Sequence, residues 1–254
     1  MVVNIRGDKS HELVENALSV LANMSHRGAE GADGKSGDGA GIMVQIPHEF
    51  ILLQGIPVPE KGRYGTGLMF LPKDEARKKE VISSLEGEIR GESLALAHLR
   101  DVPVNSSCIG EEAAREEPSV VQIFVVPNEY LEEDALEKKL YRVRKRFERL
   151  AGEGYICSLS TRNIVYKGML TSRQLRDYYE DLRSPWFTSA MAIVHSRFST
   201  NTFPQWSLAQ PFRMLCHNGE INTIRGNRSW MKARESVLGG GALGDISDLT
   251  PIFQ

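Results

Sequence analysis

The sequence has few cysteines and no excess of charge of one sign. Its three cysteines, Cys108, Cys157 and Cys216, are an odd number without a Cys-x-x-C pair, which argues against a disulfide framework and a structural zinc site. A reducing, cytoplasmic setting is therefore expected. The 31 basic and 33 acidic side chains give a formal charge of −2. This balance argues against nucleic-acid binding or a polybasic membrane patch as the main activity.

Membrane segments and linkers are also lacking. No stretch approaches the roughly 18 uninterrupted apolar residues of a membrane span. The first nine residues include Arg6, Asp8 and Lys9 and no apolar block, so a secretory signal is not expected. No run rich in Pro, Gly and Ser divides the chain, and we expect one domain over residues 1–254. A composition of 41% hydrophobic and 25% charged residues is typical of a globular protein with a sizeable core.

Helical and strand-like patterns alternate along the chain without a regular β-α-β order. Apolar residues recur at helical spacing after Ser10, whose hydroxyl can cap a helix. We predict helices over residues 10–24, 73–85, 129–151, 171–182 and 223–237, the last with a basic face. We predict strands over residues 40–46, 66–71, 94–104, 119–126, 155–160, 163–167, 191–196 and 213–217, with 191–196 and 213–217 paired in the core. This order favours antiparallel sheets with helices outside them over a doubly wound fold.

A loop with six glycines runs from Gly28 to Gly41. It contains Gly34-Lys35-Ser36, but a phosphate loop requires a glycine at the position of Ala29 and a strand before the loop, where a helix is predicted. Two interpretations remain. The segment is a surface loop without a role, or its glycines let the backbone approach a ligand in the wall of an active site.

Two later segments carry polar groups at the predicted ends of apolar strands. Arg197 follows one strand, where its guanidinium suits bidentate capture of a carboxylate; the alternative is an ion pair with an acidic residue. Asn218 and Gly219 follow the other, where an amide and a backbone N–H suit an oxyanion hole; the alternative is a hairpin turn.

A cysteine and a histidine also stand next to each other in the second segment. Adjacent residues of a strand point to opposite faces, so Cys216 and His217 are not expected to form a nucleophile–base pair. We interpret Cys216 as a small core residue. His26 and His195 lack partners at metal-ligand spacing, and hydrogen-bonded structural roles are expected for both.

These segments resemble the glutaminase domain of the large subunit of glutamate synthase. The resemblance rests on H-R-G-A at 26–29, G-D-G-A-G-I-M-V-Q-I-P-H-E-F at 37–50, H-S-R-F-S-T-N-T at 195–202, C-H-N-G-E-I-N-T-I-R-G-N at 216–227 and W-M-K-A-R-E at 230–235. It extends from about residue 2 to the end. It implies a class II glutamine amidotransferase with the N-terminal-nucleophile hydrolase fold, an α+β four-layer αββα sandwich with two antiparallel sheets.

The resemblance also implies a reaction and its partners. In this family L-glutamine is hydrolysed to glutamate and ammonia, and the ammonia passes to an FMN-binding synthase domain or subunit. The FMN, the iron–sulfur cluster and the reduced electron donor belong to other parts of the family's enzymes. No cofactor or metal is therefore expected in this domain, and neither nucleic acid nor membrane is an expected partner.

The resemblance assigns roles to residues of this sequence. Arg197 matches the arginine that holds the substrate α-carboxylate, and Thr200 matches a substrate-contacting position. Asn218 and Gly219 match the oxyanion-hole pair. Arg27 matches a position close to the nucleophile.

The sequence departs from the family pattern at both ends. The family's nucleophile is the cysteine of a Cys-Gly-(Val/Ile)-Gly-Phe start, whose own α-amine acts as the base, and Met1 aligns just after that motif. An aspartate in a G-S-D-S block, which binds the substrate α-amino group, lies beyond Gln254. The sequence as given is expected to be inactive, either as a piece of a longer enzyme or, alternatively, as a non-catalytic glutamine-binding or scaffolding module.

Overall fold

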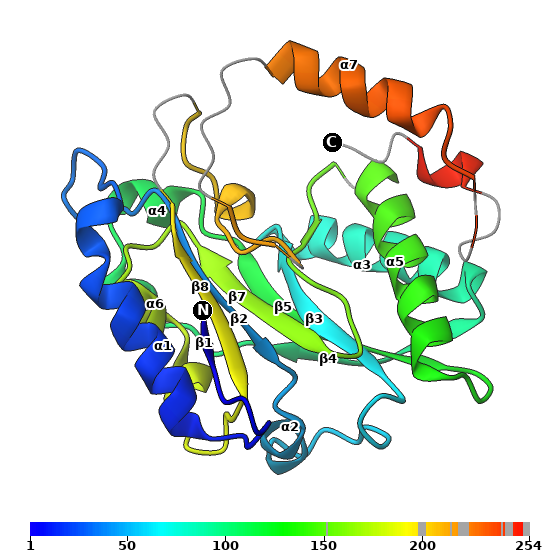
Figure 1. Cartoon of the computed structure of the whole chain (residues 1–254), viewed down its shortest axis with the longest axis horizontal. Coiled ribbons are helices and arrows are strands. Elements are labelled where there is room, and N and C mark those ends of the chain that lie inside the picture. Colours follow the sequence, from blue (N-terminus) through cyan, green and yellow to red (C-terminus); the bar gives the residue numbers. More distant parts are fainter. Residues whose placement is uncertain are drawn as a thin grey trace.

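Two antiparallel sheets form the centre of the protein (Figure 1). The computed structural model describes residues 1–150, 152–197, 202–213, 215–217, 224–239, 241 and 246–250. The first sheet has the strand order β1 (Val2–Val3), β8 (Met191–Ser196), β2 (Ala40–Gln45) and β7 (Asn163–Gly168). The second has the order β4 (Leu94–Asp101), β5 (Ser119–Pro127), β3 (Gly65–Leu71) and β6 (Tyr155–Ile156). The predicted α+β sandwich with two antiparallel sheets is confirmed.

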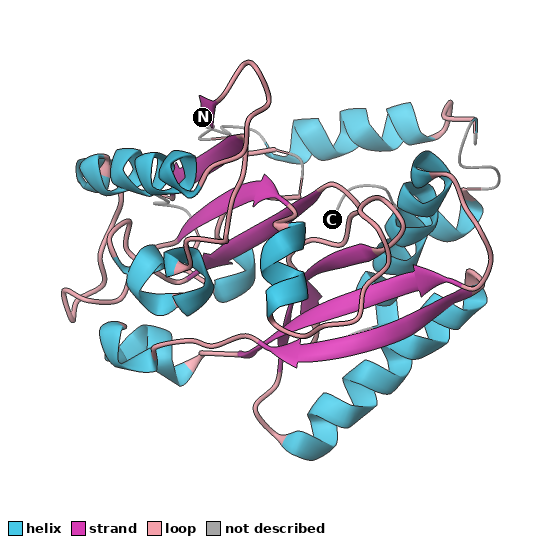
Figure 2. Ribbon diagram, turned by 90° about the horizontal axis from the view of Figure 1, so that it is seen from below, coloured by secondary structure: helices cyan, strands magenta, loops and turns pink. Residues whose placement is uncertain are grey.

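Helices surround the two sheets, as Figure 2 shows. The hydroxyl of Ser10 accepts a hydrogen bond from Leu13 N at 3.2 Å and caps α1, as predicted. The longer helices are α1 (His11–Asn23), α3 (Glu75–Gly91), α5 (Glu133–Leu150) and α7 (Ile224–Glu235). The shorter ones are α2 (His48–Leu53), α4 (Glu111–Arg115) and α6 (Gln174–Tyr178).

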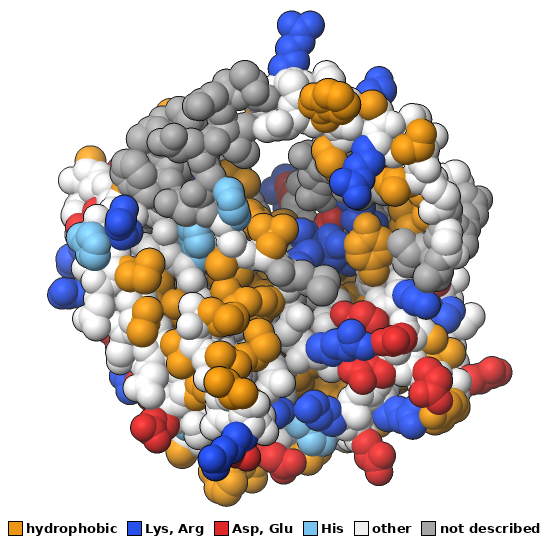
Figure 3. Space-filling model, in the orientation of Figure 1, with side chains coloured by type: hydrophobic (Ala, Val, Ile, Leu, Met, Phe, Trp, Pro, Cys, Tyr) orange, Lys and Arg blue, Asp and Glu red, His pale blue; other side chains and the backbone are white. Residues whose placement is uncertain are grey.

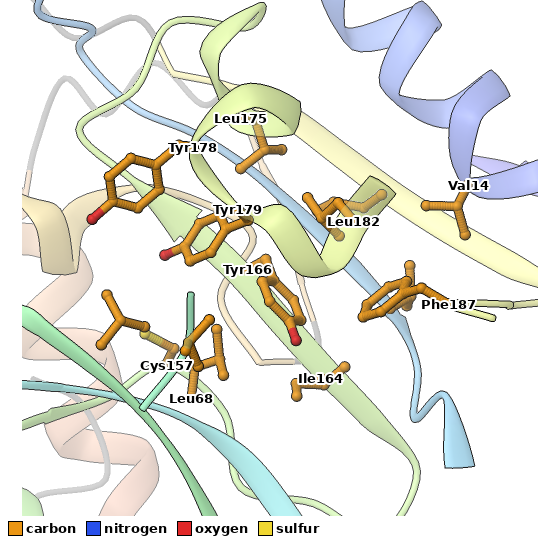
Figure 4. Packing of buried hydrophobic residues seen from close by; sticks show 14 of the residues in the cluster. Val14, Leu68, Cys157, Ile164, Tyr166, Leu175, Tyr178, Tyr179, Leu182 and Phe187 are labelled. Atoms are coloured by element: carbon orange, nitrogen blue, oxygen red, sulfur yellow. The ribbon is translucent and has the colours of Figure 1, made fainter. Parts of the chain in front are cut away.

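Two apolar clusters hold the layers together. In one, Met69 and Val121 of the second sheet pack with Leu85 of α3 and Leu140 of α5. The other joins the first sheet to α1 and α6 and contains a group of aromatic rings (Figure 4). In that group the Tyr166 ring meets the edge of a neighbouring tyrosine with the centroids 5.0 Å apart. These clusters fix the positions of the strand ends at which the polar groups lie.

Helix α7 differs from the other long helices because none of its residues is buried. Its apolar side chains include Ile224 and Trp230, which are 57% and 75% exposed. Hydrophobic and basic side chains lie along this helix in Figure 3. The predicted helix over 223–237 is therefore confirmed within one or two residues, and its side chains face solvent.

Some predicted elements are wrong. The described residues of 213–217 do not form a core strand: Phe212 and Leu215 make an isolated bridge, Arg213 has a φ of 39°, and Leu215 is 57% exposed. The predicted helix over 171–182 is reduced to α6 and a 3-10 turn, Glu180–Arg183. The predicted strand over 155–160 is reduced to β6. An apolar run this short does not by itself distinguish a strand from a turn.

No helix in the described part of the chain combines the length and apolar character that crossing a bilayer requires.

Candidate active site at the ends of β8 and β2

A cavity of about 270 Å³ lies where β8 ends and β2 begins. Four segments that are distant in the sequence form its wall: the turn after α1, the start of β2, the residues after β7 and the end of β8. The lining residues are Ser25, Gly28, Ala29, Glu30, Gly39, Leu170, Thr171, Ser172, Arg173, Ser196 and Arg197. The cavity is close in size to small-molecule sites, and the polar groups in its wall can fix the orientation of a ligand.

Arg197 is buried in this wall and has protein partners on both terminal nitrogens. Nη1 donates to Oδ1 and to the backbone oxygen of Asp38, at 2.6 and 3.1 Å, and Nη2 donates to Oγ1 of Thr202 at 2.6 Å. Arg197 and Asp38 are 8% and 5% exposed. The ion pair that the sequence left open as an alternative is therefore present. Binding of a ligand carboxylate by Arg197 remains a prediction.

The glycine loop brings Asp38 to Arg197 by packing tightly against the rest of the protein. A Cβ on Gly37 would lie 2.0 Å from the carbonyl carbon of Leu170. The backbone N–H of Arg197 donates to the oxygen of Gly39 at 2.7 Å. Of the two interpretations of this loop, the cavity wall is the one that the structure supports. The close approach made by Gly37, however, is to the protein's own backbone.

The first half of the loop is held by its own side chains and by α4. Asp33 Oδ1 accepts from the backbone N–H groups of Lys35 and Ser36, and Oδ2 accepts from the Ser36 hydroxyl. That hydroxyl in turn accepts from Ala113 N of α4 at 3.0 Å. These hydrogen bonds lower the pKa of Asp33 well below its usual range, and the bond from the Ser36 hydroxyl has the largest effect. The loop therefore has a defined shape where it enters the cavity wall.

Two buried hydroxyls lie in the cavity wall beside the arginine. Ser172 Oγ and Ser196 Oγ are hydrogen-bonded at 2.9 Å. A Cβ on Gly28 would lie 2.7 Å from Ser196 Oγ, so the turn after α1 also approaches this pair closely. Sequence reasoning did not select either serine.

His195 lies two residues before Arg197, on the same face of β8. It is 8% exposed, and its Nδ1 has no hydrogen-bond partner among the described residues, so the expected structural hydrogen bond is absent at this atom. Burial lowers the pKa of His195, and His217 and Arg197 lower it further. His195 is therefore neutral at pH 7.

Cys216 and His217 lie outside any strand, because the predicted strand is absent. Cys216 is partly exposed rather than a core residue, which corrects that interpretation. The backbone of His217 is held by Gln210: Gln210 Nε2 donates to the His217 oxygen at 2.8 Å, and the His217 N–H donates to Gln210 Oε1 at 2.7 Å. These bonds fix the chain immediately before Asn218.

The other predicted site residues are Thr200, Asn218, Gly219 and Arg27. Thr200, Asn218 and Gly219 lie outside the described residues. Arg27 lies in a 3-10 turn, Ser25–Arg27, and is exposed next to the cavity-lining Gly28. The roles of these four residues stay predictions.

Strand β1 lies alongside β8 and approaches the same end of the sheet. Its register pairs Val2 with Ala192 and Val3 with Met191, and Figure 1 shows the N-terminus beside β8. Because the two strands are antiparallel, each residue nearer the N-terminus on β1 lies opposite a residue of β8 that is one position nearer Arg197. Continued at this register, residues ahead of Met1 would run alongside the end of β8 toward Arg197.

A buried lysine anchors the segment that follows Arg197. Lys167 is fully buried in β7, and its Nζ donates to the Tyr155 hydroxyl at 2.9 Å and to the Ser207 oxygen at 2.8 Å. It also lies 4.4 Å from the centre of the Phe212 ring. Burial lowers the pKa of Lys167 to about 7.

Replacing Lys167 by methionine is expected to change how stability depends on pH. The unfolded lysine keeps its proton up to about pH 10.5, whereas the folded one loses it near pH 7, so the free energy of unfolding should rise with pH between these values. From pH 7 to pH 9 this contribution is about 2 kcal/mol. Urea unfolding of the original chain and of Lys167→Met at pH 7 and pH 9 gives the free energy of unfolding of each. The contribution of Lys167 is the difference between the two proteins in how much this free energy changes with pH. Equal changes would show that Lys167 is not the titrating group.

Comparisons with known proteins agree with the resemblance seen in the sequence. The family model described as "Glutamine amidotransferases class-II" matches residues 1–254. Ferredoxin-dependent glutamate synthase 2 of Synechocystis is 44% identical over the whole chain, and the NADPH glutamate synthase large chain of Bacillus subtilis is 42% identical over the whole chain. The NADH glutamate synthase of Saccharomyces cerevisiae is also 42% identical. The chain spans 17%, 17% and 13% of the length of these relatives. With its two antiparallel sheets and a match along its entire length, the chain belongs to the class II glutamine amidotransferases.

Proposed function

We propose that this chain is the glutaminase domain of a glutamate synthase, which binds L-glutamine, hydrolyses it to glutamate and ammonia, and supplies the ammonia to a synthase domain. The observation that carries the proposal is the position of Arg197. The fold places this guanidinium in the wall of a cavity where the glycine loop and β8 meet. Both segments belong to the blocks that match the family.

The nucleophile in this proposal comes from residues ahead of β1. In the described chain, Cys157 is fully buried and burial raises the pKa of its thiol to about 12, so it is an inert core residue. Cys108 does not line the cavity, and burial also raises its pKa. A cysteine ahead of Met1 would approach Arg197 if the register of β1 and β8 continued. The family's Cys-Gly-(Val/Ile)-Gly-Phe start, which aligns just ahead of Met1, would bring its nucleophile to this end of β8.

The partners follow from the same proposal. The FMN, the iron–sulfur cluster and the reduced electron donor belong to the synthase part of the enzyme rather than to this domain. The ammonia acceptor is an FMN-binding synthase domain or subunit, and the setting is the cytoplasm. The alternative function is a glutamine-binding or scaffolding module without hydrolysis. Both functions require a glutamine site at Arg197, and they differ in whether a cysteine precedes Met1.

Replacing Arg197 by lysine is expected to weaken L-glutamine binding at least tenfold. A lysine ammonium is a point charge and does not reproduce the hydrogen bonds of a planar guanidinium to a carboxylate and to Asp38. Titration calorimetry of L-glutamine into the original and substituted chains measures the change. Arg183→Lys is the matched control, because Arg183 is an exposed surface arginine paired with Asp177. Unchanged affinity in Arg197→Lys would remove Arg197 from the site.

A further inference from the structure

The hydrogen bonds of Arg197 determine which of its edges is available to a ligand. A guanidinium has five N–H donors. Nη1 uses its two on Asp38, and Nη2 uses one on Thr202. Among the described residues, no acceptor is within hydrogen-bonding geometry of Nε. The remaining donors are therefore the Nε–H and one N–H of Nη2, which together can hold the two oxygens of a carboxylate side-on.

We propose that Asp38 is a positioning residue for glutamine binding: it holds Nη1 of Arg197 so that the Nε and Nη2 edge receives the substrate α-carboxylate. This inference rests on the proposed function and adds a residue that acts through Arg197. In its described contacts with the guanidinium, Asp38 accepts from Nη1, the end that the substrate does not use.

The clamp on Nη1 is rigid because it has a backbone component as well as a side chain. The oxygen and the carboxylate of Asp38 both accept from the same nitrogen. The N–H of Asp38 donates to the Ala29 oxygen at 3.0 Å, and the oxygen of the next residue accepts from the Arg197 N–H at 2.7 Å. Rotation of the guanidinium about its long side chain would break these contacts. The loop thus defines the orientation of Arg197 before a ligand arrives.

The charges at the site fit the same ligand. Arg197 and Asp38 form a buried pair that is neutral overall. L-Glutamine at neutral pH is a zwitterion with an uncharged side chain and is also neutral overall, so its binding adds no net charge to the buried site. A ligand with a second carboxylate and no ammonium group would add negative charge beside Asp38. The pair therefore favours glutamine over a dicarboxylic acid of similar size.

Two substitutions at Asp38 distinguish an effect on the position of the Arg197 guanidinium from an effect on the fold of the loop. Asp38→Ala removes the side-chain acceptor, whereas Asp38→Asn keeps an oxygen at the same place and removes the charge. L-glutamine affinity is expected to fall at least tenfold in Asp38→Ala and only a few-fold in Asp38→Asn. Asp177→Ala, at an exposed acidic residue paired with Arg183, is the control and is expected to bind as the original chain does. Equal affinities in the Asp38→Ala and original chains would overturn the proposal.

A second readout does not depend on glutamine. In ¹⁵N-labelled protein, the Nη1–H signal of Arg197, identified by its loss in Arg197→Lys, is expected to exchange slowly with solvent in the original chain and in Asp38→Asn, and rapidly in Asp38→Ala, because Asp38 accepts from Nη1. Addition of L-glutamine is expected to shift this signal. If glutamine does not bind the original chain, the proposed function fails, and faster exchange in Asp38→Ala still supports Asp38 as the group that holds Arg197. Identical exchange in all three chains would overturn the proposal.

Discussion

Alanine at Gly37 is expected to destabilise the protein by about 3 kcal/mol, a large effect for the addition of one methyl group. The new Cβ would lie 2.0 Å from the carbonyl carbon of Leu170 and 2.2 Å from the backbone nitrogen of Thr171. Both are backbone atoms, which cannot rotate away as the end of a side chain can. The loop must therefore shift, and it would carry Asp38 away from Arg197.

Urea unfolding measures this effect, and a second glycine provides a matched control. Gly87 lies within α3, and no atom lies within 4 Å of a Cβ built there. Gly87→Ala is expected to stabilise the protein by about 1 kcal/mol, because alanine is the better helix former. If the free energy of unfolding of Gly37→Ala stays within about 0.5 kcal/mol of that of the original chain, the glycine loop is not packed as tightly as described.

The sequence predicts β8, β2 and β7 of the first sheet well but does not predict β1. The prediction for residues 191–196 matches β8, and that for 40–46 is one residue longer than β2. Both are apolar runs with clear ends: β8 ends just before Arg197, and β2 begins among the glycines. Because the polar residue that ends the run is visible in the sequence, the position of Arg197 at the end of an apolar strand is predictable from the sequence alone.

The acidic partner of Arg197 could not be predicted, because tertiary structure determines which acidic residue lies beside it. Thirty-three acidic residues are present, and Asp38 is separated from Arg197 by 159 positions. One signal was available: Asp38 stands between Gly37 and Gly39, directly before a predicted strand. The error at residues 213–217 has a different cause. That run is apolar enough for a strand, but the bridge from Phe212 to Leu215 turns it back on itself.

A chain extended at both ends is expected to gain glutaminase activity, the second large effect. The N-terminal extension is Cys-Gly-Val-Gly-Phe ahead of Met1, and the C-terminal one continues the family sequence beyond Gln254 through its Gly-Ser-Asp-Ser block. If the register of β1 and β8 continues, the added cysteine approaches Arg197. Its thiol would attack the amide carbon of glutamine, with its own α-amine as the base. The added aspartate would bind the substrate α-amino group.

The most direct test is ammonia release from L-glutamine by this extended chain, compared with an identical chain in which the added cysteine is alanine. We predict steady ammonia release by the cysteine form and none above background by the alanine form or by residues 1–254 alone. Loss of release when Arg197→Lys is added to the cysteine form would locate the reaction at the cavity. A folded cysteine form that binds glutamine but releases no ammonia would contradict the glutaminase assignment and favour the binding module.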